Sequence, residues 1–343
     1  MRAAICLRLC LLFLRISRWV PIVIVFIISA FVYYAYCFYT VHALTDQWNV
    51  RIALISVFHV LLFMFLFAYL SAVMNSVPKM PSKFYLPASV VELELSIEKS
   101  DYGRNVILYR HAMENALPIE NVSLTNGPRY CPVCKCIKAD RCHHCSLCSA
   151  CVLKYDHHCP WINNCVHHRN YKSFVLFLFY GLTLCVFVLL SSLPTLIIQW
   201  NEEAKSYLLI QKFIMVFLPF VALLFGCSFG CLLIYHMVLI FKNRTTIEQF
   251  MPPHFEFGPD VHAYDLGTYN NFKQVFGNSI LFWGIPIFTG LTDGLSFPLR
   301  DDSVELESVH SDSNTSTNGI YYSCSSESVA TALYGSKDEK VMV

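Results

Sequence analysis

YCPVCKCIKADRCHHCSLCSACVLKYDHHCPWINNCVHHRNY, from Tyr130 to Tyr171, is the most informative part of this chain, and we call it the cysteine-rich block. Nine of the sixteen cysteines lie in it, together with six histidines. Cysteine pairs two residues apart, followed by interleaved histidine and cysteine, are typical of tetrahedral zinc sites, because two such thiolates can bind one face of the ion. Clustered cysteines also differ from a secreted disulfide scaffold, which favours metal binding in a reducing compartment.

Four long stretches on either side of this block contain no Asp, Glu, Lys or Arg, and they cover residues 19–45, 52–78, 173–201 and 213–241. Each exceeds the roughly 20 apolar residues that a helix needs to cross a bilayer. The chain is 55% hydrophobic and only 14% charged, which also favours a membrane protein. Core helices of a soluble protein seldom run so long without a charge, and residues 19–45 are too long for a signal peptide. The sequence therefore predicts an all-α polytopic membrane protein with four transmembrane helices.

The placement of Lys and Arg predicts the orientation of the chain. Both are frequent in the N-terminal segment and in the loop between the second and third spans, whereas the other two short loops carry few. Both termini and the cysteine-rich block should therefore face the cytosol. The net charge of +1 gives no drive toward nucleic acid, so no nucleic-acid partner is expected. We expect a multi-pass protein of the Golgi, the ER or another endomembrane, with the plasma membrane as the alternative.

The chain divides into six predicted segments. They are a basic cytosolic N-terminus at 1–18, a transmembrane hairpin at 19–78, a cytosolic loop at 79–172 that holds the zinc domain from about residue 129, two further spans at 173–241, a cytosolic segment at 242–298 and a disordered tail at 299–343. Residues 90–116 are expected to form a cytosolic helix. The apolar part of residues 270–288 is too short to cross, so it should pack against the bundle or enter the membrane interface.

A count of zinc ligands separates structural residues from reactive ones, because two zinc ions need eight ligands. Two pairs and four closing ligands supply them, namely Cys131, Cys134, Cys145, Cys148, His144, Cys151, His158 and Cys165. Asp156, His157 and Cys159 are then left over, and such a set can act as orienting group, base and nucleophile. The spacing alone leaves open that Cys159 is itself a ligand, exchanged with Cys165.

Closed sites with four protein ligands have no open position for a metal-bound water, so both zinc ions would be structural. They would hold a loop with little hydrophobic core, so that the leftover residues keep their geometry. His157 would take the Cys159 proton and Asp156 would orient the imidazole, while nearby positive charge would favour the reactive thiolate.

The run from Asp156 through Cys159 to Cys165, DHHCPWINNC, resembles the signature of the DHHC family of protein S-acyltransferases, or palmitoyltransferases. The stretch TTIE at Thr246 resembles the family's TTxE motif, and NNFKQVFG at Asn271 resembles its PaCCT motif. With four spans and the loop between the second and third, the resemblance covers roughly residues 19–298. It implies one zinc ion on Cys131, Cys134, His144 and Cys151, and a second on Cys145, Cys148, His158 and Cys165.

The same resemblance implies a reaction and its substrates. Cys159 would be the nucleophile that carries the acyl group, with His157 and Asp156 assisting. Thr246 would contact Asp156, and Asn271 would brace the C-terminal segment. The co-substrate would be a long-chain acyl-CoA such as palmitoyl-CoA, and the acceptors would be membrane-associated proteins with cytosolic cysteines.

The position of the block at the bilayer predicts where an acyl-CoA would lie. Burial of a methylene is worth about 0.8 kcal/mol, so a long chain gains from a slot between the spans. Phe174 and Phe177 are candidates to line that slot or else face lipid, and Trp161 would shape the entrance or anchor the loop among headgroups. The candidates for the CoA phosphates, against the alternative of anionic lipid, are Lys138, Arg141 and Lys172.

The alternative function is a membrane-anchored zinc-binding adaptor without catalysis. It accounts for the cysteines, but it gives no role to His157 and Cys159 if neither binds metal.

Overall fold

The computed structural model describes residues 16–95, 98–200 and 208–300, and all structural statements below concern these residues. Most of the predicted basic N-terminus and almost all of the predicted tail lie outside them.

Four helices are long and apolar enough to cross a membrane, and their spans are Val20–Leu44, Trp48–Met74, Tyr171–Ile197 and Leu209–Phe241. The first consists of α2 (Val20–Ala35), the π-helical turn η1 (Tyr36–Thr40) and α3 (Val41–Leu44). The others are α4 (Trp48–Met74), α6 (Tyr171–Trp200) and α7 (Leu209–Phe241). The prediction of four spans is confirmed. The third begins earlier than expected because Lys172, used as a boundary, belongs to its first turn.

Helix α6 is the centre of the helical bundle. Half of its most apolar window is buried, against 22% in each of the other spans, and it packs against both α4 and α7. Aromatic side chains fill these contacts: the ring centroid of Phe177 on α6 lies 5.2 Å from that of Tyr69 on α4 and 5.4 Å from that of Phe229 on α7. The bundle therefore holds the start of α6 in a fixed place, directly after the cysteine-rich block.

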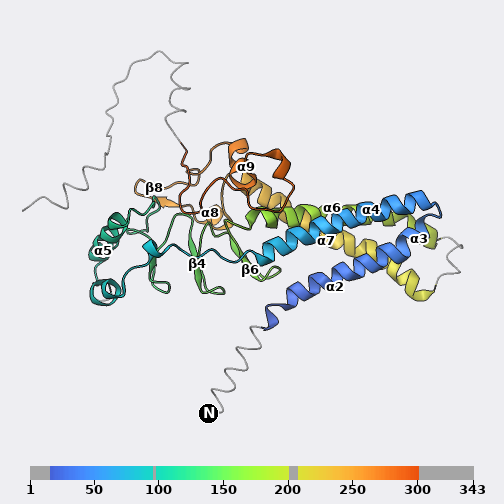
Figure 1. Ribbon diagram of the computed structural model, residues 1–343, viewed down its shortest axis with the longest axis horizontal. Helices are drawn as coiled ribbons and strands as arrows, with labels where there is room; N and C mark the ends of the chain where they lie inside the picture. Colours follow the sequence, from blue (N-terminus) through green and yellow to red (C-terminus); the bar gives the residue numbers. More distant parts are fainter. Residues whose placement is uncertain (1–15, 96–97, 201–207, 301–343) are drawn as a thin grey trace, which may run out of the picture. The chain divides into compact units, whose positions relative to one another are not determined.

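The cysteine-rich block consists of three antiparallel hairpins, drawn in green between α5 and the spans in Figure 1. They are β1 (Tyr130–Cys131) with β2 (Cys136–Ile137), β3 (His143–Cys145) with β4 (Ala150–Val152), and β5 (His157–Cys159) with β6 (Asn164–Val166). Their turns contain residues with left-handed backbone, namely Lys135, Ser149 and Asn163. The chain is thus mostly helical, but the predicted all-α class missed these strands, which are too short to show an alternating apolar pattern.

The remaining elements are short, and they are η2 (Ser82–Phe84), η3 (Val90–Leu95), α5 (Asp101–Glu114), α8 (Thr246–Phe250), β7 (His254–Phe255), β8 (Gly258–Pro259), α9 (Thr268–Phe276) and η5 (Ile280–Phe282). The single helix predicted at 90–116 is wrong. The Ser100 side chain accepts a hydrogen bond from the Gly103 backbone N–H at 2.9 Å and so caps a new helix.

Candidate active site

Each of the two predicted ligand sets comes together in space. Within the described residues, the ligand atoms of Cys131, Cys134, His144 and Cys151 lie within 4.8 Å of one another, as do those of Cys145, Cys148, His158 and Cys165. In the first set the three sulfurs lie 3.6, 3.3 and 4.0 Å from the histidine Nδ1, and in the second 3.7, 3.5 and 3.6 Å. Tetrahedral zinc, with bonds of about 2.3 Å to sulfur and 2.0 Å to nitrogen, sets this separation at roughly 3.6 Å. Both sets therefore fit zinc.

Strand pairing explains why these ligands meet. In the second hairpin His144 lies opposite Cys151, and in the third His158 lies opposite Cys165. Side chains directly opposite each other in an antiparallel pair point to the same face. Each of these two hairpins therefore presents one histidine and one cysteine to the same ligand set, and the β3–β4 hairpin supplies ligands to both sets.

The alternation of side chains along β5 places the predicted zinc ligand His158 on one face of the strand and His157 and Cys159 on the other. Successive residues of a strand point to opposite faces, so His158 faces the zinc site while His157 and Cys159 share the other face. Both line an internal cavity, which His158 does not. Cys159 therefore lies outside both ligand sets, which argues against the alternative in which it exchanges with Cys165.

The carboxylate of Asp156 is held by three hydrogen bonds. Thr246 donates to it twice, from its backbone N–H at 2.8 Å and its hydroxyl at 2.7 Å. The Nδ1 atom of His157 lies 2.7 Å from Asp156 Oδ2, the oxygen that also accepts from the Thr246 hydroxyl. The structure thus brings Asp156, His157 and Thr246 together as the resemblance implies, and it leaves the other nitrogen of the imidazole for Cys159.

These contacts change the protonation of the pair. Burial alone lowers the pKa of His157, but the hydrogen bond to Asp156 and the adjacent Cys159 outweigh burial and raise that pKa to about 9. Burial raises the pKa of Asp156, but the hydrogen bond from His157 outweighs it and holds that pKa below its usual range. Near neutral pH the pair is therefore an imidazolium next to a carboxylate.

A cavity of about 440 Å³ extends from this pair into the helical bundle. His157, Cys159 and Trp161 line it, and the four spans supply apolar side chains that include Val25, Leu62, Phe174, Phe177, Leu184 and Phe229. Phe174 also contacts His157, with ring centroids 5.5 Å apart. The structure therefore places Phe174 and Phe177 on the cavity and not toward lipid, while Trp161 remains 46% exposed at its edge.

The C-terminal end of α4 holds the third hairpin over this cavity. The Tyr69 hydroxyl donates to the Trp161 carbonyl at 2.9 Å, and the Asn164 amide donates to the Asn75 carbonyl at 2.7 Å. Ile162 between them is fully buried. Cys159 is thus positioned by a membrane helix as well as by the hairpin that carries His158 and Cys165.

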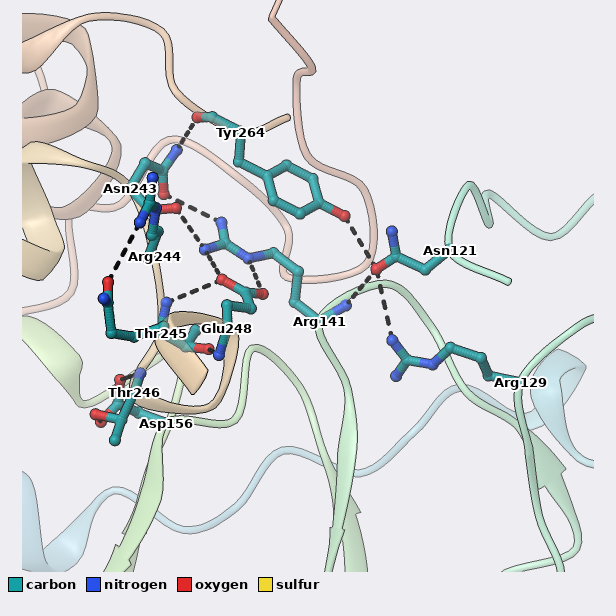
Figure 2. A network of polar contacts seen from close by, with 11 residues as sticks. Asn121, Arg129, Arg141, Asp156, Asn243, Arg244, Thr245, Thr246, Glu248 and Tyr264 are labelled. Carbon is teal, nitrogen blue, oxygen red and sulfur yellow. Dashed lines mark hydrogen bonds and ion pairs between the residues drawn. The ribbon is translucent and has the colours of Figure 1, made fainter. Parts of the chain in front are cut away.

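Arg141 does not lie where the sequence analysis expected a phosphate ligand. Its guanidinium is buried and donates two hydrogen bonds to the Glu248 carboxylate, at 2.8 and 2.7 Å. It also donates to the side chain and backbone carbonyls of Asn243, and it stacks on Tyr264 at 4.4 Å (Figure 2). No face of it remains for CoA. Glu248 faces Arg141 as a carboxylate. Burial raises the pKa of Glu248, but the charge and hydrogen bonds of Arg141 outweigh burial and lower that pKa.

Lys172 is also engaged elsewhere. It is 2% exposed and donates from Nζ to the Phe282 carbonyl at 2.7 Å and the Thr289 hydroxyl at 2.8 Å. The predicted phosphate contact is therefore wrong for Arg141 and Lys172, and half-buried Lys138 alone of the three stays a candidate.

Asn271 joins the segment after α7 back to that helix. Its amide donates to the Phe241 carbonyl at 2.7 Å and to the Asp265 carboxylate at 2.6 Å, and its oxygen accepts from the Leu266 backbone N–H at 2.8 Å. It is fully buried, which fits the bracing role that the resemblance implies.

His236 on α7 also belongs to this site and was not among the predicted site residues. Its ring lines the cavity and lies 5.9 Å from the His157 ring, and its Nδ1 lies 3.2 Å from the Tyr171 hydroxyl. Ionisable residues within transmembrane spans are costly and usually mark function, so a histidine in an apolar span was a usable sequence signal.

Comparison with known proteins agrees with this geometry. Residues 124–252 match the family described as DHHC palmitoyltransferase. The chain is 41% identical over 294 residues to "Palmitoyltransferase ZDHHC20-A" of Danio rerio, which covers 84% of this chain and 80% of that relative. It is 40% identical over 291 residues to "Palmitoyltransferase ZDHHC20" of Homo sapiens, with 83% and 78% covered. It is 37% identical over 287 residues to "Palmitoyltransferase ZDHHC15" of Xenopus laevis, with 83% of each chain covered. The cysteine-rich block lies between two pairs of membrane spans, and these relatives are 37–41% identical over most of the chain. The chain therefore belongs to the DHHC palmitoyltransferase family.

Proposed function

We propose that this protein is a protein S-palmitoyltransferase in which Cys159 carries the acyl group. The observation that supports this most is the position of Cys159. It lies outside both zinc ligand sets, on the same strand face as His157, and it lines a cavity with apolar walls. A thiol next to an imidazole at the end of an apolar cavity is what acyl transfer from a lipid thioester needs.

The first half-reaction forms the acyl-enzyme. With the proton already on His157, the Cys159 sulfur attacks the carbonyl carbon of the acyl-CoA thioester. The bond between that carbon and the CoA sulfur breaks, and the CoA thiolate takes the proton from His157. Asp156, held by Thr246, keeps the imidazole oriented through both transfers.

The second half-reaction moves the acyl group to a protein. The acceptor cysteine gives its proton to His157 and attacks the acyl-enzyme carbonyl, the bond from that carbon to the Cys159 sulfur breaks, and the proton stays on His157, which restores the starting pair. One thioester replaces another in each step, so the change in free energy is small and positioning limits the rate. Orientation with the block toward the cytosol would restrict acceptors to cytosol-facing cysteines next to the membrane.

The acyl chain would occupy the cavity between the spans. Each methylene that leaves water contributes about 0.8 kcal/mol, so a long chain binds far better than a short one. Phe174 and Phe177 would contact the chain next to the thioester, with Trp161 at the entrance. Lys138 would be the cation nearest to the CoA phosphates outside the membrane.

Zinc at the two Cys₃His sites would have a structural role, because each site offers four protein ligands and no open position. The residues around it do the chemistry. His158 and Cys165 fix the third hairpin on one face, which leaves His157 and Cys159 aligned on the other.

The test is single-turnover acylation of the purified full chain with radiolabelled palmitoyl-CoA. Wild-type protein should take up label that neutral hydroxylamine removes, since that reagent cleaves thioesters. Cys159→Ser should take up none, and His157→Gln should label at least about 100-fold more slowly, in the range of lost general base catalysis.

Zinc content must be measured on the same samples. Label on Cys159→Ser equal to wild type, with zinc intact, would refute the proposal and favour the zinc-binding adaptor. Loss of label together with loss of zinc from Cys159→Ser would refute it differently, because it would make Cys159 a metal ligand.

A further inference from the structure

The segment from Gly277 to Leu291, which we call the C-terminal loop, exposes more apolar side chain than a water-facing loop should. Ile280 is 70% exposed, Leu281 80% and Phe282 43%. No Asp, Glu, Lys or Arg occurs between Lys273 and Asp293. Contiguous exposed apolar patches of this kind mark an interaction site, with protein or with membrane.

The two ends of this loop lie against each other. Gly277 has a left-handed φ of 80°, and a Cβ placed there would come within 2.5 Å of the Thr289 carbonyl oxygen. The Thr289 hydroxyl donates to the Phe276 carbonyl at 2.7 Å. Only glycine fits this closure. The C-terminal loop therefore leaves the end of α9 and returns next to that end, so it cannot cross a bilayer.

Side chains of two membrane spans satisfy the backbone of this loop. Alternate carbonyls face the spans: Phe282 accepts from Lys172 at 2.7 Å, Gly284 from the Tyr180 hydroxyl at 2.7 Å and Pro286 from Ser71 at 2.8 Å. Ser173 also donates to Pro286 at 3.2 Å. Non-helical backbone within a membrane is tolerated only where protein satisfies its polar groups. In water these carbonyls would not need donors from an apolar helix.

The donors also give a depth. Tyr180 lies nine positions after Tyr171, where α6 begins, which is about 13 Å along the helix at about 1.5 Å per residue. A helical side chain leans back toward the N-terminus, so the Gly284 carbonyl lies somewhat less deep than that. Interfacial segments bury their apolar face about 5–10 Å into the boundary between headgroups and acyl chains. The Trp283 indole, which donates to the Gly277 carbonyl at 3.0 Å, suits that zone.

We propose that the C-terminal loop is a re-entrant membrane anchor that inserts Ile280, Leu281 and Phe282 into the boundary between headgroups and acyl chains, in the leaflet on the side of the cysteine-rich block. The occupant of this apolar surface is lipid, because the loop accepts hydrogen bonds from Ser71 of α4 and Tyr180 of α6, and the residues directly before these donors, Leu70 and Phe179, are exposed apolar side chains of the spans. Figure 1 shows the orange segment after α9 next to the end of α6 that joins the green strands. The inference depends on the spans and not on acyl transfer.

The test places a fluorescent reporter on the loop in the full chain. Leu281→Trp and a control, Phe257→Trp, are reconstituted in phosphatidylcholine vesicles, and the signal of the five native tryptophans is subtracted. Phe257 is the control because it is 77% exposed, between β7 and β8. Lipids brominated on the upper part of the chain should quench the Leu281→Trp signal at least about two-fold more than aqueous iodide does, given an interfacial depth of about 5–10 Å. The control should show the reverse.

Two results would overturn the proposal. Iodide that quenches Leu281→Trp as well as the control would place the loop in water. A signal that neither quencher reaches, and that becomes accessible when the protein is diluted with excess lipid, would show a second copy of the chain on this surface. Ile280→Trp repeats the measurement at the adjacent exposed site if Leu281→Trp does not reconstitute.

Discussion

Removal of one member of the buried Arg141–Glu248 ion pair should strongly destabilise the cysteine-rich block. The two side chains are 0% and 5% exposed and share two hydrogen bonds of 2.8 and 2.7 Å. Glu248→Leu would leave a guanidinium without its counterion, and loss of one partner of a buried pair costs about 3–5 kcal/mol. At about 1.4 kcal/mol for each tenfold change, the unfolding equilibrium should shift roughly 100- to 4,000-fold.

The double variant separates charge from packing. Arg141→Met with Glu248→Leu removes both charges and keeps apolar volume, and such replacements of buried pairs are often close to neutral. The double variant should therefore be more stable than either single variant, which is a coupling that only interacting residues show. Loss of the hydrogen bonds to Asn243 and of the stacking on Tyr264 will offset part of this recovery.

The assay is denaturant unfolding of the full chain in detergent, with zinc release as the reporter of the cysteine-rich block and tryptophan fluorescence for the whole chain. Asp46→Asn is the matched control, because its partner Arg51 lies at a similar 2.9 Å but Asp46 is fully exposed. Exposed pairs contribute little to stability, so the control should behave as wild type.

A cost below about 1 kcal/mol for Glu248→Leu, which is the range of exposed pairs, would refute the reasoning. So would a double variant whose loss equals the sum of the two single losses, because the residues would then act independently.

Three further outcomes are expected. The pKa of Glu248 is held below 4.5 in the folded protein, so the stability that ionised Glu248 contributes is present above that pH and is lost as pH falls through the folded pKa. Unfolding curves of the wild type should show this loss of stability in acid, and the Arg141→Met/Glu248→Leu variant should not. Thr246→Val removes one of two Thr246 hydrogen bonds to Asp156, worth about 1.5–3 kcal/mol for a charged acceptor, so the acylation rate should fall about 10- to 150-fold with zinc content unchanged, whereas Thr183→Val on the exposed face of α6 should have no effect. A chelator should unfold the three hairpins and release two equivalents of zinc while circular dichroism keeps the helical signal of the spans, and retention of acylation after zinc loss would contradict a structural role for the metal.

The sequence predicted the spans and the two clusters of three cysteines and one histidine because both are local patterns. A run without charges reports its own environment, and the spacing of Cys and His reports the reach of a metal bond. The separation of Cys159 from the ligands could also be anticipated by counting. The structural reason for this separation could not be predicted, because the strands that put His157 and His158 on opposite faces are only three residues long.

The basic residues show where sequence reasoning failed. Lys138, Arg141 and Lys172 look alike in sequence, and a cation between membrane spans and a cytosolic loop is usually exposed. Arg141 is buried because Glu248, more than 100 positions later, reaches it from α8. Lys172 is buried because the C-terminal loop folds back over it. Such partners follow from tertiary packing, which no local pattern encodes.

The three residues of β5 leave no freedom in the length of the chain there. A slip of one residue moves every side chain of a strand to its opposite face. An insertion between Asp156 and Cys159 would therefore turn the Cys159 sulfur toward the second zinc site and the His158 imidazole toward the apolar cavity. Such a protein would still bind metal but would not transfer acyl groups. Changes of length that preserve acyl transfer are therefore expected outside β5 and outside the connections that carry Arg141 and Asp156.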